Sequence, residues 1–355
     1  MNGFQIWDSH VHIFPPEIYE HWKTYAVRDP YFGMLTKKSE NGTGTEEAWA
    51  NAEEALHCAE LAGVYGLVMQ GWYWNDIGLM HLHNDYMAQA IKNHPQRLKA
   101  FASINPMFGK DAITEIERCV SLGFCGIGEL GPGANGYDFQ SPQFLDVLEC
   151  AVHYHLPVCI HCGEPVGHVY PGKDTTSLAP IPQLLKRYPN LKLILAHMGG
   201  GLPFYEMNPR YKELFQNVRY DTAANPLLYD IKSIKAVISM VGPDRLLYGS
   251  DFPLLLYPSV KREMDFSLFI HDINQNAGLS EQEWIQFMGK NLLDFIMLYQ
   301  KGEITHEKSK NNGIENHIGQ RTCKRIRSRR FDCMPHAKRR RSILCGLCKT
   351  GRILR

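Results

Sequence analysis

Eight apolar segments of strand length alternate with segments of helical character over the first 300 residues, and this alternation restricts the possible folds strongly. Most of the strand-like segments are continuously apolar, which is typical of parallel strands buried on both faces. Helical spacing follows each of them, and a last helix is expected over residues 281–300. The expected strands are residues 4–14, 64–72, 98–106, 124–132, 156–163, 191–199, 217–223 and 244–253.

Eight consecutive strand-then-helix units predict a parallel sheet that closes on itself. We therefore expect an α/β protein with a distorted (β/α)8 TIM barrel over residues 1–300. An open, doubly wound sheet is the alternative, and it normally carries a glycine-rich phosphate loop after its first strand. Here the first strand ends in a His-x-His motif followed by Pro15 and Pro16, which favours the barrel.

The His-x-His motif of the first strand consists of His10 and His12. Residues two apart on a strand point to the same face, so the two imidazoles project together with Asp8. Neutral imidazole is the commonest nitrogen ligand of protein metal sites, and two such rings supply half of a metal site. Two hydrogen-bonded core histidines would leave the same local pattern. A second motif, His81 and His83, stands at a predicted helix, where residues two apart diverge, and makes a poor chelate.

Polar residues also terminate four later strands, each at the same end of its apolar run. They are Glu129 on the fourth strand, His161 on the fifth, His197 on the sixth and Asp251 on the eighth. In a (β/α)8 barrel these strand ends meet at one mouth, where active sites are built. Core residues without a shared role would scatter between both ends of the strands. Four histidines and two carboxylates at one mouth predict a divalent-metal site.

The chain resembles the amidohydrolase superfamily over about residues 4–300. The similarity is to the branch that includes amidohydrolase-2 proteins and aminocarboxymuconate-semialdehyde-decarboxylase-like enzymes. It rests on Asp8-Ser9-His10-Val11-His12, His161, Ala196-His197-Met198-Gly199-Gly200 and Gly249-Ser250-Asp251-Phe252-Pro253.

This resemblance implies that His10, His12, His161 and Asp251 bind a metal, with zinc the first choice. His197 would either bind a second metal or carry a proton. Glu129 stands where binuclear members of the superfamily place a bridging ligand, and its alternative role is to orient a histidine ligand. The implied cofactor is one or two divalent ions.

The metal site predicts an enzyme, and we expect a metal-dependent hydrolase that attacks the carbonyl of a small amide, ester or lactone. A bound divalent ion lowers the pKa of its water, Asp251 would take the proton, and the metal and His197 would stabilise the oxyanion. Non-oxidative decarboxylation of a small unsaturated or aromatic acid is the alternative on the same ligands. A TatD-like phosphodiester nuclease is a third hypothesis, suggested by Glu129.

Four residues are candidates for binding the small-molecule substrate. Trp72 and Trp74 follow the second strand and would line the mouth with aromatic surface. Arg28, on a long irregular connection over residues 15–45, can hold a carboxylate with two hydrogen bonds. Tyr170 lies in the loop after the fifth strand. Ordinary loop packing or solvated charge explains each of them equally well.

The C-terminal residues 301–355 differ from the rest in charge, with 16 Lys and Arg against 4 Asp and Glu, whereas the first 300 residues carry 22 against 33. We expect this tail to be disordered, and its charge suits weak binding of nucleic acid or another polyanion. A polyanion-binding protein is therefore the hypothesis that needs no enzyme. The N-terminus lacks the pattern of a signal peptide and no segment is apolar enough for a membrane span, so we expect a cytoplasmic protein without a membrane partner. An oligomer is compatible with the sequence.

Overall fold

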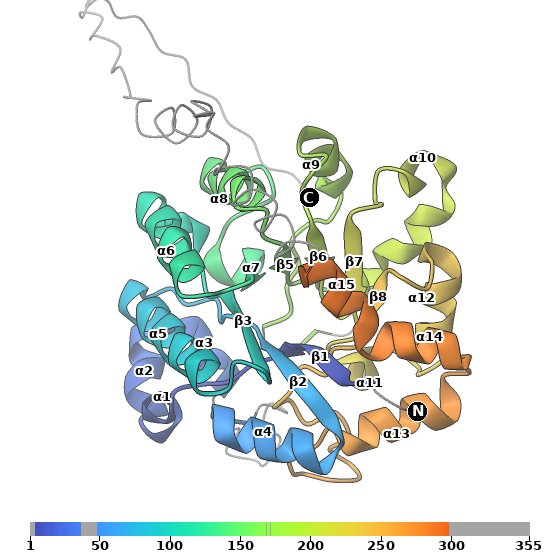
Figure 1. Cartoon of the computed structure of the whole chain (residues 1–355). Coiled ribbons are helices and arrows are strands. Elements are labelled where there is room, and N and C mark those ends of the chain that lie inside the picture. Colours follow the sequence, from blue (N-terminus) through green and yellow to red (C-terminus); the bar gives the residue numbers. More distant parts are fainter. Residues whose placement is uncertain (1–3, 37–47, 168, 171, 298–355) are drawn as a thin grey trace, which may run out of the picture. The chain divides into compact units, whose positions relative to one another are not determined.

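The computed structural model describes residues 4–36, 48–167, 169–170 and 172–297. Its eight strands are parallel and lie in the order β1 to β8 (Figure 1). A bridge from Val11 to Phe252, together with the bonds Ser9 N–H to Tyr248 O and Asp251 N–H to His10 O, joins the two ends of the sheet. The predicted (β/α)8 barrel is confirmed. The strands are β1 (Ile6–Val11), β2 (Val64–Met69), β3 (Leu98–Ala102), β4 (Gly126–Leu130), β5 (Val158–Ile160), β6 (Leu193–Leu195), β7 (Val218–Asp221) and β8 (Leu246–Leu247).

Helices follow the strands and surround the barrel (Figure 1). Before β2 the helices are α1 (Pro16–Glu20), α2 (Trp22–Arg28), α3 (Pro30–Thr36) and α4 (Ala52–Leu61). From β2 to β5 they are α5 (Ile77–Asn93), η1 (Pro106–Phe108), α6 (Lys110–Ser121), α7 (Pro132–Asn135) and α8 (Pro142–His153). From β5 to β8 they are α9 (Ile181–Arg187), η2 (His197–Met207), α10 (Pro209–Lys212), α11 (Asn225–Leu228) and α12 (Ser233–Val241). After β8 they are α13 (Ser267–Asn276), α14 (Glu281–Ile285), η3 (Gln286–Lys290) and α15 (Asn291–Met297).

A compact apolar cluster fills the barrel. It joins residues of six strands to three residues of α15, and side chains from strands all around a closed barrel can meet only in its interior. Because these residues are all buried, the inner layer is a packed core and not a channel. The cluster includes Trp7, Val68, Phe101, Cys159, Ile194, Leu247, Leu292, Phe295 and Ile296.

The structure differs from the prediction mainly at element boundaries. The connection predicted to be irregular over residues 15–45 contains α1, α2 and α3 up to Thr36, and its remainder lies outside the described residues. Proline at the first helical position, Pro16 and Pro30, suits a helix start because proline has no N–H to leave unbonded there. The helix expected from residue 46 begins after Asn51, whose side chain forms a capping box with Glu54.

The tail over residues 301–355, with its predicted disorder and polyanion binding, lies outside the described residues. Among the helices that the structure describes, none combines the length and apolar character needed to cross a lipid bilayer.

Candidate metal centre

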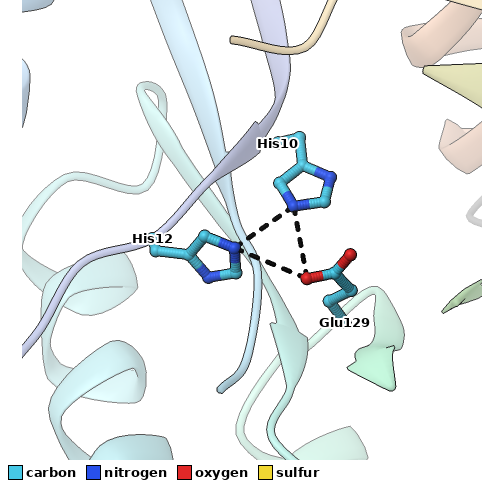
Figure 2. A group of neighbouring side chains, drawn as sticks. All are labelled: His10, His12 and Glu129. Atoms are coloured by element: carbon cyan, nitrogen blue, oxygen red, sulfur yellow. Dashed lines mark hydrogen bonds and ion pairs between the residues drawn. The ribbon is translucent and has the colours of Figure 1, made fainter. Parts of the chain in front are cut away.

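The centre begins with three side chains from two strands, whose donor atoms face one another (Figure 2). His10 and His12 come from the end of β1, and their Nε2 atoms are 3.2 Å apart. Glu129 comes from β4, and its Oε2 lies 3.6 Å from the Nε2 atom of each histidine. Both imidazoles therefore lie on the same face of the strand, as expected for residues two positions apart.

Asp251, just beyond β8, completes this first group. Its Oδ1 lies 3.6 Å from His10 Nε2 and 3.4 Å from His12 Nε2. Tetrahedral coordination with bonds of about 2.0–2.1 Å places neighbouring donors about 3.3–3.4 Å apart. The five separations given above, between the two histidines and from each histidine to each carboxylate, are close to that value, so these donors fit a small divalent cation.

A second group of donors shares Glu129 with the first. Its other oxygen, Oε1, lies 3.1 Å from His161 Nδ1 and 3.3 Å from His197 Nε2. The two imidazole nitrogens are 3.0 Å apart. The ring centroids of His10 and His197 are 5.7 Å apart, so both groups belong to one site. All six predicted ligands thus lie together at the ends of their strands.

Two of these residues have left-handed backbone conformations, His197 with φ 55° and Asp251 with φ 70°. The turn after His197 continues in this conformation through Gly199 and Gly200. A Cβ atom on Gly199 would lie 2.6 Å from the Tyr220 ring, and one on Gly200 would lie 2.6 Å from the Gly163 carbonyl oxygen. Only glycine fits there, because it has no Cβ to collide and adopts positive φ readily.

Asp221, at the end of β7, orients two of the histidines and was missed in the sequence. Its Oδ2 accepts a hydrogen bond from His10 Nδ1–H at 2.9 Å. Its Oδ1 accepts from the backbone N–H groups of His197 at 3.0 Å and Ala223 at 3.1 Å. The carboxylate fixes the His10 tautomer that turns the Nε2 lone pair toward the centre. The rule applied to the other strands, a polar residue that ends an apolar run, does not single it out, because Arg219 interrupts the apolar residues of this strand.

Two further contacts complete the frame of the site. His197 donates from Nδ1 to the Ala223 carbonyl at 3.0 Å, which leaves its Nε2 facing Glu129. Asp8 does not face the donor cluster as a ligand: its Oδ1 accepts from the N–H groups of His10 at 2.9 Å and Ser250 at 3.1 Å. These bonds tie β1 to the segment after β8.

The buried groups shift one another's pKa values in a consistent direction. Burial disfavours the charged form of His10, but the Asp221 and Glu129 carboxylates hold its pKa well above the usual range. Burial likewise opposes charge on His197, but Glu129 raises its pKa to about 9. Burial would raise the pKa of Asp251, yet its hydrogen bond with His12 and the nearby histidines lower it to about 2. The carboxylates are therefore ionised, which suits a cation between them.

An aromatic segment after β2 covers part of the centre. The Trp72 ring packs edge-on against His12 with centroids 5.4 Å apart. Trp74 does not line the mouth: it is fully buried, and its indole N–H donates to His83. Tyr73, which stands between them in the same aromatic segment, packs against His161 with ring centroids 6.1 Å apart.

The two other predicted substrate residues, Arg28 and Tyr170, bond to carboxylates that are not among the six predicted ligands. Arg28 donates to both carboxylate oxygens of Asp76, at 2.9 Å to each from Nη2. The guanidinium of Arg28 is therefore paired with a carboxylate of the protein, the same kind of group that it was expected to bind on the substrate. Tyr170 OH lies 3.5 Å from Glu164, close to Lys173.

Curated relatives of this chain include several decarboxylases and a hydratase. The 2-amino-3-carboxymuconate-6-semialdehyde decarboxylase of Dictyostelium discoideum is 26% identical over 266 residues, which cover 64% of this chain and 69% of that protein. The gamma-resorcylate decarboxylase of Rhizobium sp. (strain MTP-10005) is 26% identical over 213 residues, which cover 48% of this chain and 64% of that protein.

Solved structures share the fold. The 5-carboxyvanillate decarboxylase of Novosphingobium aromaticivorans, complexed with manganese and 4-hydroxy-3-methoxy-5-nitrobenzoic acid, superposes with a TM-score of 0.66 at 17% identity. That match covers 83% of this chain and 96% of the other.

These relatives overturn the main functional prediction. A metal-dependent hydrolase was expected from the ligand set, but the relatives named above are decarboxylases, as the predicted alternative would have it. The physical reason is that the ligands alone do not distinguish the two reactions. A sequence model of the amidohydrolase family matches residues 7–291, which include all six predicted ligands. The chain therefore belongs to the amidohydrolase family.

Proposed function

We propose that this protein is a metal-dependent, non-oxidative decarboxylase of a small unsaturated or aromatic carboxylic acid. The observation that carries the proposal is the four-residue donor cluster of His10, His12, Glu129 and Asp251, which has the spacing of a metal site. The names of the relatives support the reaction class.

His10, His12, Glu129 and Asp251 would hold the ion. A bound divalent ion supplies Lewis-acid chemistry, since it fixes an anionic substrate oxygen and stabilises negative charge. Imidazole and carboxylate donors at tetrahedral spacing suit zinc, and they also accept manganese, the metal named in the similar 5-carboxyvanillate decarboxylase structure. We propose zinc, in one ion per chain, with metal analysis of the purified protein as the test. Two ions per chain would mean that Glu129, His161 and His197 hold the second.

The reaction requires a proton at a defined carbon. The bond between the carboxylate and its neighbouring carbon breaks, the electron pair stays on that carbon, and one proton replaces the departing CO2. We propose that His197 exchanges this proton, because its Nδ1 is engaged by the Ala223 carbonyl and only Nε2 faces the centre. Glu129, 3.3 Å from that nitrogen, keeps the ring in place. No water is consumed.

The test measures what leaves the substrate. Metal-loaded protein is incubated with a panel of hydroxybenzoates and unsaturated acids labelled with carbon-13 in the carboxylate, and labelled CO2 is collected. We expect CO2 release and, in heavy water, one deuterium at the carbon that carried the carboxylate. His10→Ala should abolish both. Hydrolysis of esters or lactones that depends on His10, without CO2 release from any acid, would overturn the proposal.

A further inference from the structure

The segment η2 begins with His197 and continues through a turn of unusual backbone conformation. Every residue from His197 to Gly201 has a positive φ, between 55° and 91°. This left-handed conformation is unfavourable for His197 and Met198, which carry Cβ atoms, so contacts with the rest of the protein must hold them in it. The position of the His197 imidazole therefore depends on what fixes η2.

A buried ion pair fixes the other end of η2. Both carboxylate oxygens of Glu206 accept hydrogen bonds from the Arg245 guanidinium, Oε2 from Nη1 and Oε1 from Nη2 at 2.6 Å. Tyr220 OH donates to Glu206 Oε1 at 2.6 Å. All three side chains are buried. We call Glu206, Arg245 and Tyr220 the Glu206 clamp.

Arg245 and Tyr220 belong to the barrel, so the clamp attaches η2 to the sheet. Arg245 immediately precedes β8, and its Nε donates to the Val218 carbonyl of β7 at 3.0 Å. Tyr220 lies on β7, and its ring forms the surface under the turn, since a Cβ atom on Gly199 would lie 2.6 Å from it. The Tyr220 side chain therefore contacts both the turn after His197 and the carboxylate of Glu206.

Strand β7 thereby holds η2 at both ends. Tyr220 and Asp221 are neighbours on this strand, and neighbouring residues of a strand point to opposite faces. Asp221 accepts from the His197 N–H at 3.0 Å, at the start of η2, and Tyr220 donates to Glu206 near its end. With both ends attached to one strand, the turn between them has little freedom to move relative to the metal centre.

The buried charges of the clamp matter for geometry more than for stability. Removal of both charges from water opposes their mutual attraction, so a buried ion pair adds little net stability. If the Glu206 carboxylate moved away from Arg245, however, both charges would be left buried and unpaired, which is strongly unfavourable. The clamp thus favours the one arrangement of η2 in which Glu206 meets Arg245.

We propose that Glu206 is a positioning residue for His197. Through Arg245 and Tyr220 it holds the turn from His197 to Gly201 in its left-handed form, and this keeps the imidazole directed at the metal centre. The proposal rests on the proposed function for the role of His197 as proton carrier. The hold of the clamp on η2 does not depend on which reaction the centre catalyses.

The test uses full-length, metal-loaded protein and the variant Glu206→Gln, which keeps the size of the side chain and removes its charge. With an acid that releases CO2, kcat should fall roughly 10- to 100-fold, as expected when a catalytic group is displaced by about 1 Å. KM and zinc content should stay near those of the wild type. Hydrogen exchange of the backbone N–H groups over residues 197–207, measured by mass spectrometry, should become at least about 10-fold faster.

Glu115→Gln is the matched control. Glu115 is also buried and also pairs with an arginine, accepting from Arg118 Nε at 2.8 Å and Nη2 at 2.7 Å, but both residues lie on α6. This variant should lower the melting temperature and leave kcat and the exchange over residues 197–207 as in the wild type.

Tyr220→Phe is the milder variant, which keeps the test possible if Glu206→Gln does not fold. It removes one hydrogen bond of the clamp and leaves the ring under Gly199 in place. Both kcat and the exchange over residues 197–207 should change in the same direction as in Glu206→Gln, by a smaller factor.

Wild-type exchange over residues 197–207 in the clamp variants would overturn the proposal, as would an equal fall of kcat in Glu115→Gln or a loss of zinc that accounts for the lost activity. Failure of the proposed function is a separate outcome. If no acid releases CO2 even with the wild type, faster exchange in Glu206→Gln but not in Glu115→Gln would support the clamp and refute the decarboxylase. CO2 release at the wild-type kcat in Glu206→Gln would refute the positioning role alone.

Discussion

Replacing Asp221 with asparagine tests whether this carboxylate orients the metal centre. Asp221 accepts three hydrogen bonds, from His10 Nδ1–H at 2.9 Å and from the N–H groups of His197 at 3.0 Å and Ala223 at 3.1 Å. Asparagine keeps the size of the side chain but carries an NH2 group. That group must face either the imidazole N–H or the two backbone N–H groups, so donor meets donor in both orientations.

The expected loss of metal affinity follows from the role of a carboxylate that is hydrogen-bonded to a histidine ligand. Removing a hydrogen-bonded carboxylate behind a histidine ligand commonly weakens metal binding about 10- to 100-fold, which corresponds to about 1.4–2.7 kcal/mol. Asp221 fixes one ligand ring and the backbone of another residue of the site, so we expect the upper half of this range. The change is measured on metal-free protein by zinc titration in competition with a coloured chelator at constant pH.

Asp174→Asn is the matched control. Asp174 is also buried and accepts from two backbone N–H groups, Gly133 at 2.9 Å and Thr176 at 2.7 Å, but it bonds to none of the histidine rings of the centre. The zinc affinity of the Asp174→Asn variant should stay within about 2-fold of that of the wild type. Wild-type affinity in Asp221→Asn, or an equal loss in both variants, would show that the carboxylate supports the fold and not the ligand.

Three further predictions concern stability and the limits of the catalytic unit. Burial lowers the pKa of His83 to about 4, so stability present above pH 6.5 is lost as the pH falls toward 4. His83→Gln should remove about 2–3 kcal/mol of that loss between pH 7 and 4.5 in urea unfolding, and an unchanged pH slope would contradict the assignment. Gly199→Ala should lower the melting temperature and His197-dependent activity more than Gly201→Ala, because only Gly199 faces a ring, that of Tyr220, and equal effects would refute the steric argument. A chain cut after residue 300 should keep metal binding and catalysis but lose salt-sensitive binding to polyanions, and loss of catalysis would place the tail in the site.

The fold was predictable because its determinants are local and repeated. Continuous apolar runs identify buried parallel strands, and eight of them in alternation with helices leave few topologies. The ligands were predictable for a related reason, since polar residues that end such runs gather at one mouth. The same rule does not find Asp221, because Arg219 interrupts the apolar residues of its strand.

The substrate side of the site was less predictable, because it depends on backbone that has left regular geometry. Period-two reasoning would put Trp72 and Trp74 on one face, yet Trp72 meets His12 while Trp74 is buried against His83. The sequence pattern predicts no partner within the protein for Arg28, but in the structure this side chain forms an ion pair with Asp76. Both outcomes follow from partners distant in the chain, which no local pattern reports.

The choice between hydrolysis and decarboxylation also depends on the substrate side of the site and not on the metal ligands. A cluster of imidazoles and carboxylates determines that a cation binds and that negative charge is stabilised beside it, and both reactions develop such charge. What separates them is which bond of the substrate is held over the centre. A carbonyl must be presented to an attacking oxygen in one case, and a carbon–carbon bond must be held where its electrons can enter a conjugated system in the other. That orientation depends on the residues that contact the substrate around the metal ligands, and the spacing of the ligands does not identify those residues.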